Sequence, residues 1–203
     1  IYKDISKMYR DTDSNKNIER RILSPSEIDS FANEVPDEWV DEGISIEVMK
    51  KYNIRIDHKT NRIVYPIYDN DGNLIGFKGR TRFKNYKTMK IQKYQNYTKI
   101  GTTDFLVGLK ENKENIKKKN EIIIFEGIKS GMKVEGWGYD NWSASETGWL
   151  NDAQVRILIE LGVKNVVIAY DNDVPIKKIY ACTHILKRFT NVYAVTDRQS
   201  SKK

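Results

Sequence analysis

Hydrophobic and polar positions alternate with a period of two from about residue 54 to residue 80. Ile63, Tyr65 and Ile67 point one way, and Leu74 and Phe77 continue the pattern after residues 69–73 (DNDGN). A period of two predicts strands. The intervening segment is rich in turn-forming residues and carries a glycine suited to positive φ. The sequence therefore predicts a β-hairpin here.

The second half of the chain has a different pattern. Short continuous apolar runs at 121–125 (EIIIF) and within 163–173 (VKNVVIAYDND) are typical of parallel strands covered on both faces. Residues 141–145 and 191–196 are further candidate strands. Helical spacing of apolar residues begins near residue 129 and recurs at 151–161 and 179–189. Strands that alternate with helices predict an α/β fold with a parallel sheet flanked by helices.

The N-terminal part predicts a smaller α+β subdomain. Residues 1–23 are polar and are expected to form a peripheral helix or lead-in. Three short helices are predicted next, beginning near Ser24, at residues 37–39 and after Ser45. Residues 105–110 predict a short helix or turn, and 110–120 (KENKENIKKKN) a polar surface connection. We expect one subdomain at 1–110, with the hairpin, and a parallel-sheet domain at 111–203.

Composition narrows the class of protein. The 203 residues are 39% hydrophobic and include one cysteine, which excludes an internal disulfide framework or a multi-cysteine zinc site within this chain. No apolar run approaches the roughly 18–20 residues of a membrane span, and we recognise no signal peptide, so we expect a cytoplasmic protein. The first residue is Ile rather than Met, so we expect a piece of a longer protein. The net charge of +7 suits a polyanionic partner.

Carboxylates follow two of the predicted parallel strands. Glu126 comes directly after Phe125, and Asp171 and Asp173 follow Tyr170 with the two-residue spacing that puts both on one side of an extended chain. Ligands of open parallel sheets bind beyond the carboxyl ends of the strands. Three carboxylates at one edge would repel one another unless a cation neutralises them, and oxygen ligands suit Mg²⁺ or Mn²⁺. Each motif alone is more often a turn or a helix cap.

These residues resemble a known family. The segments EIIIFEG and VVIAYDND, with SASETGWLND between them, look like the TOPRIM fold of DnaG-type bacterial and phage primases. The resemblance continues upstream in RIVYPIYDNDGNLIGFKGR, WVDEGISIEVMKKYNIRI and KYQNY, so it covers roughly residues 37–195. It implies a primase RNA-polymerase domain that synthesises RNA primers on single-stranded DNA from nucleoside triphosphates, with a replicative helicase as a further partner, in a bacterial cell or a phage-infected host.

The resemblance also implies roles for particular residues. Glu126, Asp171 and Asp173 match the catalytic and metal-binding acids of the family. The family uses basic residues near nucleotide and template, and Arg62, Arg80 and Lys93 match three of these positions. A further family lysine aligns with Thr102, or with Lys99 if the loop has shifted. Ser130 stands where the family often has another acid. Further family acids lie beyond the last strand, so we expect the domain to be truncated at its C-terminal end.

Two alternatives remain open. A TOPRIM nuclease would use the same carboxylates with water as the nucleophile, but would lack the upstream hairpin and KYQNY. A non-catalytic nucleic-acid-binding module is suggested by Ser130. Tyr86, Tyr94 and Tyr97, interleaved with lysines, either stack single-stranded bases or form a strand face. Trp137, Trp142 and Trp149 are expected to be packing residues rather than platforms for a ligand.

Overall fold

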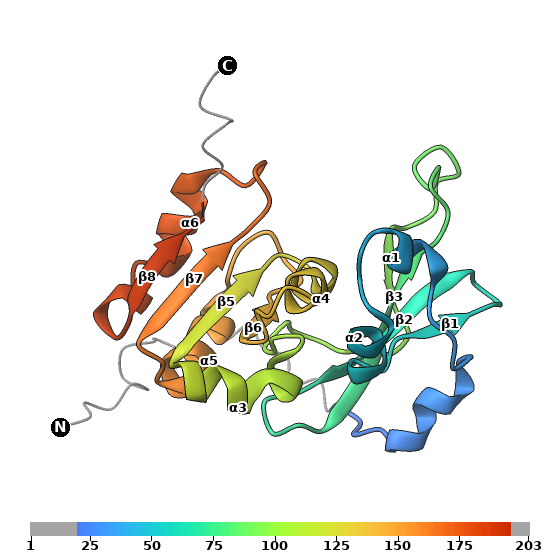
Figure 1. Cartoon of the computed structure of the whole chain (residues 1–203), viewed down its shortest axis with the longest axis horizontal. Helices are drawn as coiled ribbons and strands as arrows, with labels where there is room; N and C mark the ends of the chain where they lie inside the picture. The colour runs from blue at the N-terminus through green and yellow to red at the C-terminus, as the bar shows by residue number, and fades with distance from the viewer. Residues whose placement is uncertain (1–19, 196–203) are drawn as a thin grey trace.

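The computed structural model of the chain describes residues 20–195, which form two four-stranded sheets side by side (Figure 1). The predicted α/β architecture is confirmed, with one antiparallel sheet and one parallel sheet. The helices flank the parallel sheet or precede the antiparallel one. None of the helices within these residues combines the length and apolar character that crossing a membrane requires.

The antiparallel sheet contains the predicted hairpin. Its strands lie in the order β1 (Arg55–Asp57), β2 (Arg62–Tyr68), β3 (Leu74–Thr81) and β4 (Tyr94–Asn96). The Asp69 carboxylate closes the β2–β3 turn by accepting hydrogen bonds from the backbone N–H groups of Asp71 and Asn73, at 3.0 and 2.8 Å. Gly72 adopts a φ of +85°, which glycine tolerates without strain. The turn chemistry thus fixes the register of the sheet.

Short helices precede this sheet at the predicted positions. A 3-10 helix spans Pro25–Ser30, α1 spans Asp37–Asp41 and α2 spans Ile46–Lys51. The Ser45 hydroxyl caps α2 by accepting a hydrogen bond from the N–H of Val48. The predicted element within residues 1–23 lies largely outside the described residues.

The parallel sheet has the strand order β6 (Trp142–Ala144), β5 (Glu121–Phe125), β7 (Asn165–Ala169) and β8 (Asn191–Ala194). Its flanking helices are α3 (Leu109–Lys119), α4 (Ile128–Glu135), α5 (Asp152–Leu161) and α6 (Ile176–Thr183), and the last is followed by a 3-10 turn at Leu186–Arg188. Asn151 caps α5 through its side chain, and Gly162 ends that helix in the left-handed conformation. The predicted alternation of strand and helix is confirmed.

The prediction of a polar surface connection at 110–120 is wrong, because this segment forms α3. Leu109, Asn112 and Ile116 are buried at helical spacing, whereas most of the charged residues between them are exposed and Glu111 is partly buried. Gly108 and Asn120 bound the helix with positive φ. A helix with so few inward positions looks like a charged loop in sequence, and its packing becomes evident only in three dimensions.

The two sheets share part of their hydrophobic core. One cluster contains side chains that precede or belong to the antiparallel sheet, such as Trp39 and Tyr65, together with Phe125 and Trp142 from the parallel sheet. Trp142 is fully buried, as predicted, whereas Trp137 and Trp149 are 65% and 52% exposed, so the packing predicted for these two is wrong. A second cluster lies between the parallel sheet and its helices.

Candidate active site

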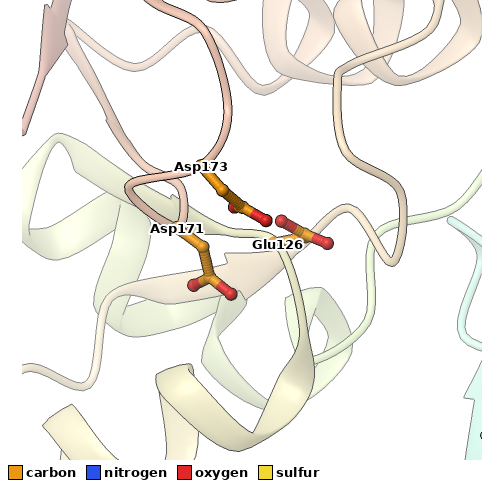
Figure 2. A group of neighbouring side chains, drawn as sticks. All are labelled: Glu126, Asp171 and Asp173. Carbon is orange, nitrogen blue, oxygen red and sulfur yellow. The ribbon is translucent and has the colours of Figure 1, made fainter.

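Three carboxylates meet at one edge of the parallel sheet. Phe125 at the end of β5 pairs with Ala169 at the end of β7, so the residues that follow both strands emerge at the same rim. Figure 2 shows Glu126 and Asp173 with their carboxylates turned toward one another and Asp171 beside them. One oxygen from each of the three acids lies within 4.8 Å of the others. The structure therefore brings together the acids that the sequence had placed 45 residues apart.

The cluster carries negative charge that the surrounding protein does not neutralise. Within residues 20–195, the three carboxylates form no ion pair and accept no hydrogen bond; the ion pairs there use other acids, such as Glu135 and Glu146. Partial burial raises the pKa of Glu126, and the charges of Asp171 and Asp173 raise it further. A set of close, unpaired carboxylate oxygens fits a divalent cation such as Mg²⁺ or Mn²⁺.

Cations gather around Tyr94 of the antiparallel sheet, and one of them acts on this rim. The positive charge of Lys93 lowers the pKa of Glu126, which places the lysine within electrostatic range of the acids. Tyr94 lies among Lys78, Arg80 and Lys93, whose charged groups are 5.0, 6.0 and 5.5 Å from the centre of its ring. The carboxylates thus follow strands of the parallel sheet, whereas these cations belong to β3 and to the segment just before β4.

A groove of roughly 600 Å³ lies on the side of the basic residues. Its lining includes the side chains of Trp39, Arg80, Arg82, Lys84, Tyr86 and Lys93. Two of these, Arg80 and Lys93, were predicted as binding residues. The lining combines aromatic rings with cations, as sites for single-stranded nucleic acid or nucleotides do. Glu38 forms a bidentate ion pair with Arg82 at one side of the groove, at 2.6 and 2.9 Å.

Two predicted binding residues occupy other positions. Arg62 is only 4% exposed, and its guanidinium donates hydrogen bonds to the backbone carbonyls of Gly79 and Gln92. In this structure Arg62 therefore anchors β3 and the segment before β4, and its role in binding template or nucleotide stays a prediction. Lys99 is exposed but does not line the groove, while the oxygens of Thr102 accept hydrogen bonds from Arg20.

The three tyrosines interleaved with lysines also take different places. Tyr86 lines the groove, and Tyr94 is partly buried among the cations. Tyr97 donates a hydrogen bond to Asp57 and packs edge-on against Phe31, which makes it part of the sheet. Stacking of bases therefore stays a prediction for Tyr86 and Tyr94.

Sequence reasoning missed a buried pair beside the acids. Glu146, in the loop after β6, forms an ion pair with Lys78 of β3 at 2.7 Å. The loop belongs to the segment SASETGWLND that carries part of the resemblance, but no spacing marks this glutamate as buried. Its partner lies in the other sheet, 68 residues earlier, so no local pattern connects the two.

Comparison with known proteins agrees with the sequence resemblance. Residues 14–102 match the family model described as DNA primase catalytic core, N-terminal domain. The DNA primase of Enterococcus faecalis (strain ATCC 700802 / V583) is 31% identical over 147 residues, which are 70% of this chain and 23% of that protein. The matched family model and this relative are both DNA primases, and the chain is similar to both. The chain spans about a quarter of the length of that curated relative.

Solved primase structures share the fold. The zinc-binding and RNA polymerase domains of the Aquifex aeolicus primase superpose with a TM-score of 0.67 at 24% identity, over 79% of this chain and 49% of that one. A DnaG primase catalytic domain bound to single-stranded DNA superposes with a TM-score of 0.61 at 18% identity, over 81% and 63%. The two-sheet arrangement is thus that of a primase catalytic core.

Proposed function

We propose that this chain catalyses the template-directed synthesis of short RNA primers on single-stranded DNA, by metal-dependent nucleotidyl transfer. The observation that carries the proposal is the cluster of Glu126, Asp171 and Asp173, with Lys93 close enough for its charge to act on Glu126. Nucleotidyl transfer requires negative charge to hold a divalent cation and positive charge to hold a triphosphate. The primase fold and family support this choice over a nuclease, which would need only the acids.

In this proposal Glu126, Asp171 and Asp173 hold Mg²⁺ or Mn²⁺. When bound, the cation would supply charge stabilisation at the reacting phosphate and lower the pKa of the attacking 3′-hydroxyl. Arg80 and Lys93 bind the phosphates of the incoming nucleotide, because both line the groove beside Tyr94 and the charge of Lys93 acts on Glu126. The groove next to them accommodates the template strand, held mainly through its backbone and by stacking.

We further propose the wider setting that the family implies. Residues 1–110 would act as the N-terminal subdomain and 111–203 as a TOPRIM domain, with the shared hydrophobic cluster joining them. The relative found to bind single-stranded DNA supports single-stranded DNA as the template here. A replicative helicase as partner, and the cytoplasm of a bacterial or phage-infected cell as location, complete this proposal.

A primer-synthesis assay tests the function. The chain is incubated with single-stranded template, labelled ribonucleotides and Mn²⁺, and the products are separated by size. Glu126→Gln should reduce synthesis by more than about a hundredfold, with template affinity and melting temperature kept. Glu114→Gln is the matched control, because Glu114 is exposed on α3. Cleaved template would indicate the nuclease, and binding without turnover the non-catalytic module; either result contradicts the proposal.

Lys93→Ala separates nucleotide binding from the metal site. Because the charge of Lys93 acts on Glu126 and Lys93 is not one of the three acids, we expect the KM for nucleoside triphosphate to rise by about tenfold or more, with Mn²⁺ affinity kept within about threefold. An unchanged KM would remove Lys93 from the nucleotide site.

A further inference from the structure

Glu146 lies at the same rim as the acidic cluster, but it is enclosed by protein. Its side chain is 4% exposed. One carboxylate oxygen accepts a hydrogen bond from the backbone N–H of Ile128 at 2.9 Å. The other oxygen accepts hydrogen bonds from the Tyr65 hydroxyl at 2.8 Å and the Lys78 ammonium at 2.7 Å. This one side chain therefore connects the rim of the parallel sheet to β2 and β3 of the antiparallel sheet.

The contacts of Glu146 compensate for its burial. A buried carboxylate is strongly unfavourable unless a cation and hydrogen-bond donors surround it. Lys78 supplies the opposite charge, and Tyr65 and the Ile128 N–H supply two further donors. The backbone of Glu146 has a φ of +57°, which is uncommon for a residue with a side chain and persists where surrounding contacts impose it. The rim is therefore held by a specific set of partners.

The contact with Ile128 bears directly on Glu126. Ile128 is the first residue of α4, and its N–H has no acceptor within the helix. Only Gly127 separates it from Glu126, and a glycine has no side chain that could fix this short connection. The Glu146 carboxylate thus fixes the far end of the connection that carries the Glu126 side chain.

We propose that Glu146 is a positioning residue: it holds the start of α4 so that the Glu126 carboxylate stays directed toward Asp171 and Asp173, and Lys78 compensates its charge. The inference rests on the proposed function, because it concerns the geometry of the same cation site. It also assigns a role to the antiparallel sheet beyond binding: Lys78 and Tyr65 support the acidic rim from the other side.

Two double variants with equal net charge test the hydrogen bond to Ile128, and the leucine variant also removes the acceptor of Tyr65. In Glu146→Gln with Lys78→Met, the amide oxygen can still accept from Ile128, and the ammonium that would oppose the amide NH₂ is gone. In Glu146→Leu with Lys78→Met, Ile128 has no acceptor. Dissociation constants for Mn²⁺ are measured by electron paramagnetic resonance on the full chain. We expect the glutamine pair to stay within about threefold of the parent and the leucine pair to be weaker by about tenfold or more.

A second measurement needs no metal. Hydrogen exchange of the Ile128 amide in the metal-free protein should be slow in the parent and in the glutamine pair, and faster by about tenfold or more in the leucine pair. The single Glu146→Gln variant should bind Mn²⁺ more weakly than its pair with Lys78→Met, because the amide NH₂ then faces a cation. Melting curves identify any variant that has lost its fold.

The outcomes separate the two proposals. Equal Mn²⁺ dissociation constants and equal Ile128 exchange in the two folded double variants would overturn the positioning role while leaving the cation site intact. Failure of the parent chain to bind Mn²⁺ would overturn the proposed function. In that case the exchange rate of Ile128 still decides whether Glu146 fixes this backbone segment.

Discussion

Replacing Asn112 by Leu tests how the parallel sheet is attached to its neighbouring helices. Asn112 lies on α3 and is fully buried. Its side-chain NH₂ donates to the backbone carbonyl of Trp142 at 2.9 Å. Its oxygen accepts from the Lys51 ammonium at 2.7 Å and the Tyr52 hydroxyl at 2.8 Å. Leucine has a similar shape and removes all three hydrogen bonds.

The expected loss of stability follows from what each partner keeps. The Trp142 carbonyl loses this donor in a buried place, which costs about 1–3 kcal/mol. Lys51 loses less, because it still donates to Glu135 at 2.7 Å, and so does Tyr52, whose single hydroxyl proton is shared between Asn112 and Glu135 in the parent and can then be donated to Glu135 alone at 2.5 Å. Burying leucine instead of an amide offsets about 1 kcal/mol. The net destabilisation is about 2 kcal/mol, which for a chain of this size lowers the melting temperature by about 4–8 °C.

Urea unfolding followed by tryptophan fluorescence measures the free energy of unfolding of the Asn112→Leu variant. Asn115→Leu is the matched control, because Asn115 is half-buried on the same helix and makes no side-chain hydrogen bond within the described part of the chain. The control should change the free energy by less than about 0.5 kcal/mol. If both variants unfold at the same urea concentration as the parent, the reasoning about this polar network is refuted.

Two further substitutions test packing and charge. In Gly131→Ala, the added methyl group would overlap the Trp142 ring, so we expect about 1–3 kcal/mol of destabilisation by urea unfolding. In the control Gly148→Ala, no atom lies within 4 Å of the added methyl group, so the free energy of unfolding should change little. Equal urea midpoints of the two variants would contradict the packing argument. Burial alone would raise the pKa of Asp57, but hydrogen bonds from two hydroxyl groups and a backbone N–H outweigh it and lower the pKa. Asp57→Asn should therefore lose about 1–2 kcal/mol near neutral pH. The difference in free energy of unfolding between variant and parent should shrink as the pH falls below about 4, because Asp57 of the parent becomes protonated as the pH passes through its lowered pKa. A difference that grows in acid would refute the assignment.

The elements that sequence predicts best are those whose pattern is local. The β2–β3 hairpin has a period of two and a turn that leaves few other conformations, and β5 and β7 are continuous apolar runs of strand length. Helix α3 was missed because only three of its eleven residues are buried, and their spacing is hidden among lysines and glutamates. Local pattern fails where a helix depends on few tertiary contacts.

The same distinction applies to the candidate site. Glu126, Asp171 and Asp173 could be placed together because the ends of adjacent parallel strands meet at one rim. The burial of Arg62 could not be predicted, since it depends on carbonyl groups of β3 and of the segment before β4. Glu146 was missed for a related reason: its partners come from both sheets, and the sequence does not show how the sheets pack.

The packing of the two sheets also determines the distance between opposite charges at the site. The acids follow β5 and β7, whereas Arg80 and Lys93 belong to β3 and to the segment just before β4. Beneath them, the shared cluster with Tyr65 and Trp142 fixes one sheet against the other. Since charge interactions weaken with distance and with access of water, a small shift between the sheets would change the cation and phosphate sites together. Substitutions in that shared core should therefore alter activity without any contact with substrate.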